Sequence, residues 1–306
     1  MKRKQKKKEL VLGGQAVIEG VLIKSERNLA VAVRLPNGKI RTKKQRIGKF
    51  IESHPWLKLP FIRGITYLIQ VLVIGIRTLY ESANEQVGEK EKITTASVII
   101  SLLIALGFAF LLFKLIPLGI TKILQTYRVI GANRFVFNLI DGVIRIAIFL
   151  LYILIISLMK EVKVLFQYHG AEHKAVNCYE AKKKLTIENV KKYSTLHKRC
   201  GTSFLLLVLV IAILIFSLVP VELPFYLLLL YRLPLILPIA SIAYEVLKLS
   251  AKYPKNPVFR LLIKPGLFLQ KITTREPNDE QVEVAIRALE TILTLEKFRN
   301  QRKFYI

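Results

Sequence analysis

Long apolar runs separated by polar, mostly basic segments dominate the pattern along this chain of 306 residues. Four runs read as helices that cross the roughly 30 Å hydrocarbon layer of a bilayer. They occupy residues 96–120, 135–159, 203–219 and 222–247. Pro234 and Pro238 predict a kink in the last run, and Arg232 is expected to snorkel or to lie outside the membrane. The pattern therefore predicts a mainly α, polytopic membrane protein with about four transmembrane helices, in the regions 96–159 and 203–249.

Another apolar run, residues 61–80, is interrupted by Arg63, Gln70 and Arg77. The stretch between the two arginines is too short to cross a bilayer comfortably, so residues 57–82 are predicted to form an interfacial amphipathic helix. A further span is the alternative. It is less favoured because it would put the basic start and the basic middle loop on opposite sides of the membrane.

The polar segments predict a small cytoplasmic α+β domain. Apolar and polar positions alternate around "PNG" in residues 28–47, which predicts a β-hairpin within a β-rich segment 13–56. Residues 13–25, "GGQAVIEGVLIKS", predict a strand whose glycines allow close backbone approach, or a turn followed by an ordinary strand.

The C-terminal segment 250–306 contains a predicted amphipathic helix at 278–298 with Asn278 as its N-cap. Its apolar positions recur at helical spacing, so this helix should pack on the cytoplasmic domain rather than cross the membrane. The predicted buried stripe consists of Val282, Ala285, Leu289 and Ile292.

The distribution of charge predicts how the spans are oriented across the membrane, because the net charge of +27 is unevenly distributed along the chain. The basic tail 1–12, the segment 160–202 and the region after Lys248 are rich in lysine and arginine, whereas residues 219–224 carry neither. The positive-inside rule places these three regions, and both termini, on the cytoplasmic side of the cell membrane. Lys122, Arg128 and Arg134 would then lie on the external side and weaken the bias.

The opening lysines are not followed by the apolar core of a signal peptide, so secretion is not expected. The basic tail is expected to contact anionic lipid headgroups. Nucleic acid is the less favoured partner, because the chain has neither an aromatic-interleaved basic patch nor a recognised nucleic-acid module.

One cytoplasmic segment concentrates the residues that bind metals. Three of the four histidines and both cysteines lie between residues 169 and 200. Random placement would rarely gather these soft or borderline ligands, so the clustering predicts metal coordination. Histidines that merely bond to backbone or headgroups at a membrane interface are the alternative.

Helical spacing makes the prediction more specific. At roughly 100° per residue, His169 and His173 are about 40° apart on a helix, so both imidazoles can share one ion. "HGAEH" also matches the inverted zincin pattern, in which the intervening glutamate, here Glu172, acts as general base. Glu180 falls on nearly the same stripe. Cys178 stands about 180° from His169 and is expected to be a small buried hydrophobe.

A second pair, His197 and Cys200, directly precedes the third predicted span. Thr186 can cap a short helix between the two pairs and let the chain turn back, so that a hairpin closes on one ion. Zinc suits a mixed imidazole and thiolate set, and another divalent metal is the alternative. The predicted ligands are His169, His173 and either His197 or Cys200.

Six motifs in the same order resemble the YqhQ-like family of bacterial integral membrane proteins, whose members carry the general label of predicted metal-dependent enzymes. They are "GGQAVIEGV", "LPFIRG", "YHGAEHKAVNCYE", "HKRCGTSF", "AYE" and "PGLFLQKITTREPNDEQVEVAIRAL". The resemblance covers most of the chain. It implies additional site residues beyond the histidine and cysteine motifs, which are Glu180, Gln15, Glu19, Glu245 and Arg275.

Two of these residues have plain structural alternatives. Glu245 could pair with Lys248 at the membrane interface instead of lining the site. Arg275 could clamp an anionic group or bond to backbone carbonyls.

The predicted function is that of an integral membrane metalloprotein, with zinc-dependent hydrolysis of a membrane-proximal peptide, amide or ester as its chemistry. The alternative is a non-enzymatic scaffold or regulator in which a structural metal closes a clip and basic surfaces recruit proteins or lipids. A transporter has less support, because the predicted spans show no paired broken helices in matching halves and few intramembrane charges. Asp141 and Arg145 are exceptions, and their i,i+4 spacing permits a mutual ion pair.

Overall fold

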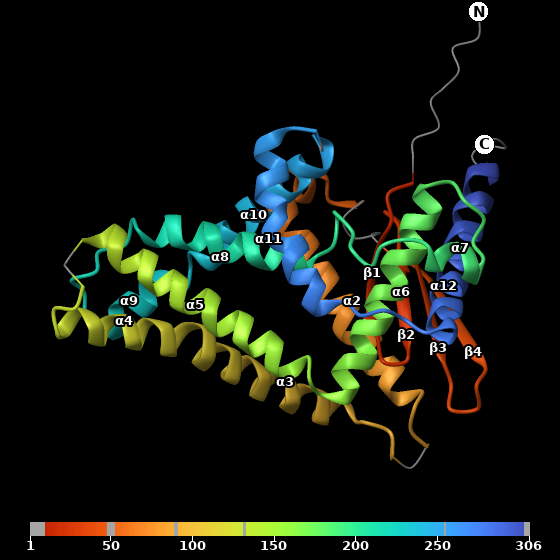
Figure 1. Ribbon diagram of the computed structural model, residues 1–306, viewed down its shortest axis with the longest axis horizontal. Coiled ribbons are helices and arrows are strands. Elements are labelled where there is room, and N and C mark those ends of the chain that lie inside the picture. Colours follow the sequence, from red (N-terminus) through yellow and green to blue (C-terminus); the bar gives the residue numbers. More distant parts are fainter. Residues whose placement is uncertain (1–9, 48–52, 89–90, 131–132, 254, 303–306) are drawn as a thin grey trace, which may run out of the picture.

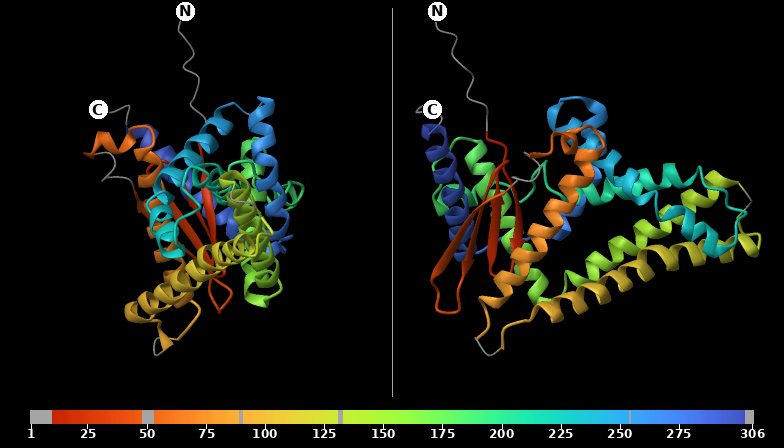
Figure 2. Two further views of the ribbon diagram at one scale, coloured as in Figure 1. Left: turned by 90° about the vertical axis from the view of Figure 1, so that its left-hand side faces the viewer. Right: turned by 180° about the vertical axis from the view of Figure 1, so that it is seen from behind.

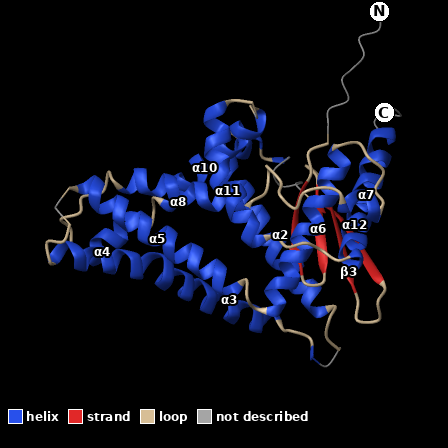
Figure 3. Ribbon diagram, in the orientation of Figure 1, coloured by secondary structure: helices blue, strands red, loops and turns tan. Residues whose placement is uncertain are grey.

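The computed structural model describes residues 10–47, 53–88, 91–130, 133–253 and 255–302. These residues are mainly helical and include a four-stranded antiparallel sheet. The figures show a sheet lobe at one end and a helical lobe at the other (Figure 1, Figure 3). Residues 1–9 of the predicted basic tail lie outside the described residues.

The sheet lobe combines distant parts of the chain. Its elements are β1 (Gly13–Val17), β2 (Gly20–Lys24), β3 (Asn28–Arg34), β4 (Ile40–Arg46), α6 (Lys160–Glu180), α7 (Ile187–Lys191) and α12 (Asp279–Arg302). The strands lie in the order β1-β2-β3-β4. The hairpin predicted around "PNG" is confirmed: Arg34 pairs with Ile40, and Gly38 has a φ of 79° in the turn.

Residues 13–25, predicted to hold a single strand, form two. Val17 pairs with Gly20, so Ile18 and Glu19 make a two-residue turn, with Glu19 at a φ of 49°. Gly20, directly after this turn, lets β3 approach closely, because a Cβ there would lie 2.4 Å from the Ala32 carbonyl oxygen. The chain therefore reverses before the predicted hairpin begins.

Both faces of the sheet are covered, which follows from the two-residue period of strand side chains. One face packs on α6 and α12, and its buried residues include Val21, Ile23, Ala30 and Ala32. The opposite face packs on Ile74 of α2 (Ile62–Asn84), and its buried residues include Val17, Leu22, Leu29, Val31 and Val33. With both faces buried, β2 and β3 carry few polar residues.

The predicted start and buried stripe of α12 are confirmed. The Asn278 side chain accepts a hydrogen bond from the Gln281 backbone at 2.9 Å, and the Gln281 side chain accepts one from the Asn278 backbone at 3.0 Å. This reciprocal pair is a capping box. The predicted stripe residues, Val282, Ala285, Leu289 and Ile292, are each 0% exposed.

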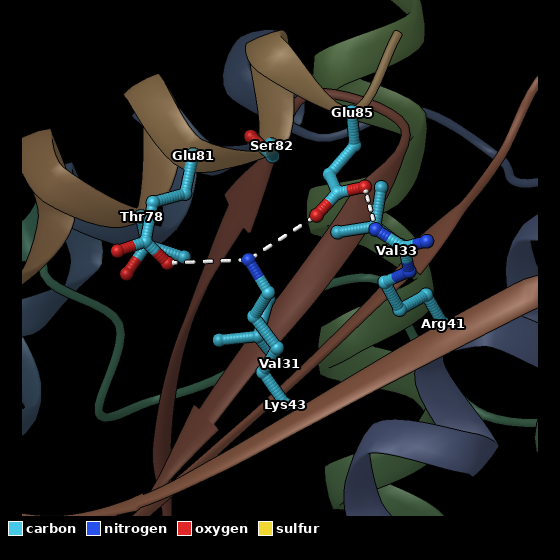
Figure 4. A pocket seen from close by; sticks show the side chains of 8 residues that line it. All are labelled: Val31, Val33, Arg41, Lys43, Thr78, Glu81, Ser82 and Glu85. Atoms are coloured by element: carbon cyan, nitrogen blue, oxygen red, sulfur yellow. Dashed lines mark hydrogen bonds and ion pairs between the residues drawn. The ribbon is translucent and has the colours of Figure 1, made fainter.

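Helix α2 joins the two lobes. Its C-terminal half docks on the sheet, where the Ser82 hydroxyl accepts a hydrogen bond from the Ile18 backbone at 3.1 Å. Figure 4 shows Glu85 paired with Arg41 and with Lys43 of β4, and Lys43 also reaching Glu81. Because α2 is also long and apolar enough to cross a membrane by length and composition, its interfacial placement stays a prediction.

The helical lobe contains the other long apolar helices. Thr95–Thr126 is one helix made of α3 (Thr95–Phe110), the π-helical η3 (Leu111–Leu115) and α4 (Ile116–Thr126), and α5 (Arg134–Ile156) runs back beside it. Both have the length and hydropathy of membrane spans, as does the bent pair α9 (Phe225–Arg232) and α10 (Ile236–Lys252). At 15 residues, α8 (Thr202–Phe216) is apolar but shorter.

Two features of this lobe differ from expectation. Arg232 does not snorkel: it is 2% exposed and bonded to Asn138 and Asp141. The C-terminal segment also contains an unpredicted helix, α11 (Pro257–Thr273), which packs against α8 despite Pro265 in its interior. The predicted kink near Pro234 is confirmed, since α9 and α10 meet at 44°.

Candidate metal centre

Helix α6 brings the first histidine pair to the junction of the two lobes. It runs without interruption through Gly170, and the lack of a side chain there allows another segment to cross closely. A Cβ at Gly170 would lie 2.0 Å from the Arg275 carbonyl oxygen, and the Arg275 backbone N–H donates to the Phe166 carbonyl at 2.9 Å. The segment after α11 is thus fixed on the face of α6 next to His169.

Cys200 completes a group of three ligand atoms. His169 Nε2 lies 3.2 Å from Cys200 Sγ, and the His169 and His173 ring centroids are 4.4 Å apart. One ligand atom from each of these three residues lies within 4.8 Å of the others. Cys200 sits in the turn just before α8, so the group joins α6 to the start of a helical-lobe helix.

Backbone carbonyls orient both imidazoles. His169 Nδ1 lies 2.9 Å from the Thr273 carbonyl oxygen, and His173 Nδ1 lies 2.5 Å from that of Thr195. A carbonyl oxygen only accepts hydrogen bonds, so each Nδ1 carries a proton, and in the neutral ring the lone pair is on Nε2, which for His169 faces Cys200 Sγ. Burial lowers the pKa of His173, which favours its neutral, ligating form.

Glu172 lies beside these rings as a buried carboxyl. It is 5% exposed, and its Oε2 has no hydrogen-bond partner among the described residues. Gly14 of β1 presses against it, since a Cβ at Gly14 would lie 2.5 Å from the carboxyl carbon. Burial raises the pKa of Glu172, and His169 and His197 act in the opposite direction.

The His197 ring lies next to that of His173, with centroids 5.6 Å apart, but its Nε2 has a different partner. Its Nε2 lies 3.6 Å from Glu180 Oε1, and Arg199 also contacts that carboxylate. The Gln270 side chain forms two hydrogen bonds with the His197 backbone: its Oε1 accepts from the N–H at 2.8 Å, and its Nε2 donates to the carbonyl oxygen at 3.0 Å. Of the two alternatives for the third ligand, Cys200 is therefore the residue that groups with His169 and His173.

The additional residues suggested by the motifs are dispersed. Glu19 accepts a hydrogen bond from the Tyr168 hydroxyl at 3.0 Å, next to His169 in sequence. Gln15 packs on α2, where a Cβ at Gly75 would lie 2.5 Å from its Oε1. Glu245 pairs with Arg63 at 2.5 Å rather than with Lys248.

Arg275 and Cys178 complete the predicted set. The Arg275 backbone contacts α6, and its Nε is buried without a hydrogen-bond partner among the described residues. Cys178 is 0% exposed and lies in the core of the sheet lobe, which confirms its prediction as a buried hydrophobe. The sequence reasoning missed the carbonyls of Thr195 and Thr273, because backbone acceptors leave no signature in side-chain patterns.

Fold and site together define a mainly helical protein in which long apolar helices carry a small α+β lobe with a histidine and cysteine cluster at the junction. A family model described as a protein of unknown function, DUF1385, matches residues 59–295. The chain is also 35% identical to the uncharacterized protein YqhQ of Bacillus subtilis strain 168, over 95% of each chain. The chain belongs to this YqhQ-like family. No solved structure matches it.

Proposed function

We propose that the protein is an integral membrane metalloprotein that holds a divalent ion, zinc foremost, at the cytoplasmic membrane face and uses it for hydrolysis. The ligands are His169 Nε2, His173 Nε2 and Cys200 Sγ. The observation that carries the proposal is the pair of Nδ1 bonds to backbone carbonyls, because they leave both Nε2 lone pairs for an ion beside the thiol.

The donor set fits zinc. Zinc bonds of about 2.0–2.3 Å to imidazole and thiolate place neighbouring ligand atoms roughly 3.3–3.8 Å apart in a tetrahedron. The three ligand atoms lie within 4.8 Å of one another, so small rotations of the side chains bring them to that geometry. Three protein ligands also leave a fourth position for water or substrate, as in catalytic zinc sites.

Glu172 supplies the acid–base chemistry in this proposal. A bound zinc ion would acidify a water molecule and polarise a carbonyl. The Glu172 carboxylate, buried and without a hydrogen-bond partner among the described residues, accepts the proton of the attacking water and returns it to the leaving group. Gly14 leaves the space that the carboxyl occupies, because a Cβ there would lie 2.5 Å from the carboxyl carbon. The substrate class is a membrane-proximal peptide, amide or ester.

A structural metal clip in a membrane scaffold or regulator is the second candidate. It is supported by the burial of the group, with His173 at 1% and Cys200 at 8% exposure. Thr195 and Thr273 also tie two separate segments to α6 through the same histidines.

Metal content and ester hydrolysis separate the candidates. Detergent-purified wild type should contain about one zinc ion per chain, and His169→Ala, His173→Ala and Cys200→Ala should lose it. Glu172→Gln should keep the ion and slow hydrolysis of 4-nitrophenyl acetate by about 10²–10⁴-fold, the usual contribution of a general base.

Two matched variants serve as controls. His197→Ala and Cys178→Ala should retain the ion, because neither side chain belongs to the group of three ligand atoms. Wild type without metal would overturn the proposal. Metal retention in Glu172→Gln with unchanged hydrolysis would favour the structural clip.

A further inference from the structure

The helical lobe contains a group of three cations, two of them buried and one half-buried, remote from the candidate metal centre. Lys114 Nζ, Arg232 Cζ and Arg145 Cζ lie 4.7, 5.0 and 5.3 Å from the ring centroid of Phe216. We call Lys114, Arg145 and Arg232 the cation cluster. They come from η3, α5 and α9, so three apolar helices meet there.

Two members of the cation cluster, Lys114 and Arg145, lie far from the ends of their helices. At 1.5 Å per residue, about 18 Å of helix separates Lys114 from the end of α4 at Thr126, and about 17 Å separates Arg145 from the start of α5 at Arg134. Charges at such depth in apolar helices are costly and mark binding sites or ion pathways.

The charges do not balance. Asp141 Oδ2 lies 2.5 Å from Arg145 Nη2 and 3.3 Å from Arg232 Nη1, whereas Lys114 makes no ion pair or hydrogen bond to the described residues. Three cations against this one carboxylate leave a formal excess of two positive charges. Arg145 is 3% exposed and Arg232 2% exposed, so bulk water does not solvate these two guanidinium groups.

Two buried polar atoms in the same place lack partners among the described residues. They are Arg232 Nε, a donor, and Asp141 Oδ1, an acceptor. A ligand that carries both negatively charged oxygens and a hydroxyl would satisfy them together.

The backbone is irregular around the cation cluster. Pro117 has no N–H to donate to the carbonyl of Phe113, and Arg145 Nε donates to that carbonyl instead, at 3.0 Å. The π-helical turn Leu111–Leu115 precedes this proline and carries Lys114. On the other side, Arg232 ends α9 at the 44° bend. Such irregularities in apolar helices are typical of functional sites.

We propose that the cation cluster binds a phosphate-type oxyanion that bears a hydroxyl. Guanidinium groups match the oxygens of phosphate in pairs, and the unpaired Lys114 adds a point charge. Leu118, Leu229 and Leu233 line the same place, so an apolar portion of the ligand would lie against leucine side chains. Inorganic phosphate and the glycerol phosphate headgroup of a lipid share this chemistry.

Thermal melting of the detergent-purified full chain tests the proposal. The chain is titrated, at constant ionic strength, with sodium phosphate in one arm and dioctanoyl phosphatidylglycerol in another. A saturable rise in the melting midpoint is expected in at least one arm, and the responding arm identifies the source of the oxyanion. Dioctanoyl phosphatidylcholine, which is zwitterionic, should give no such rise.

Lys114→Met is the decisive variant, because Lys114 makes no ion pair or hydrogen bond to the described residues whose loss would disturb folding. The affinity of this variant for the ligand that stabilises wild type, phosphate or dioctanoyl phosphatidylglycerol, should fall about 10-fold or more. This is the effect of losing a charge-assisted hydrogen bond. Arg134→Gln, on the exposed start of α5, should respond as wild type does. No saturable rise in wild type, or an undiminished rise in Lys114→Met, would overturn the proposal.

Discussion

Gly170 is the residue at which the linker after α11 crosses α6. A methyl group there would meet the Arg275 carbonyl oxygen at 2.0 Å, and backbone atoms cannot yield as a flexible side chain can. Thr273, which orients His169, lies two positions before Arg275. One methyl group at this crossing therefore affects both stability and the candidate metal centre.

We expect Gly170→Ala to destabilise the protein by about 1–3 kcal/mol, the usual cost of overpacking, and to weaken metal retention. The melting midpoint in detergent and the metal content measure these effects. Gly119→Ala is the matched control, because nothing lies within 4 Å of a Cβ on that helical glycine. A Gly170→Ala variant with wild-type stability would contradict the close crossing.

At the residue scale, the sequence predicted which side chains gather but not how they are oriented. The spacing of His169 and His173 on one helix was enough to place their rings together. It could not choose between His197 and Cys200, because both precede α8 by a few residues and the choice depends on Gln270 from a distant helix. The carbonyls of Thr195 and Thr273 depend on tertiary contacts that no local pattern encodes.

At the scale of elements, α2 combines the hydropathy of a membrane span with contacts typical of a soluble helix. Its exposed side chains include Ile69, Leu72 and Val73, while Ser82 bonds to the turn between β1 and β2. Docking on the sheet and insertion across a bilayer compete for its C-terminal half. The ion pairs with β4 favour docking.

We expect both ends of α2 to lie on the same side of the membrane. Single cysteines at Lys58 and Gly88, both exposed, should react with a membrane-impermeant maleimide from that side alone. The unsubstituted chain gives the background, because Cys178 and Cys200 are buried. Labelling of the two positions from opposite sides would mean that α2 spans the bilayer.

The sequence predicted correctly those helices and strands that are determined by residues close together in the chain. The β3–β4 hairpin follows from a turn motif between alternating residues, and α12 follows from its cap and stripe. Helix α11 was missed because Pro257, Pro265 and basic residues interrupt its apolar positions, and packing on α8 stabilises it nonetheless. The prediction that Arg232 snorkels was wrong because its partners, Asn138 and Asp141, lie on another helix, and the local sequence does not show this pairing.

At the scale of the whole molecule, the two ends of the described chain lie on the sheet lobe, and the turn between α4 and α5 lies at the opposite end (Figure 1, Figure 2). Helices of the helical lobe leave the sheet lobe and return to it in pairs. This arrangement agrees with an even number of crossings by these helices, and the basic segments favour the cytoplasm for the sheet lobe.

We therefore expect tags on both termini to be accessible only from the cytoplasmic side in sealed vesicles of known orientation. A cysteine at Tyr127, which is 78% exposed, should react only from the external side. Protease digestion of the tags and maleimide labelling measure the two predictions. If one terminus were accessible from the external side and the other from the cytoplasmic side, the chain would have to cross the membrane an odd number of times.

The sheet lobe is assembled from three stretches of chain, residues 13–46, 160–191 and 279–302, with apolar helices between them. A ribosome releases the first stretch long before the last, so one face of β1–β4 stays incompletely covered while the intervening apolar helices are synthesised. Completion of this lobe therefore requires α12, and a nascent chain that stalls before α12 exposes an apolar sheet to the quality-control machinery of the cell.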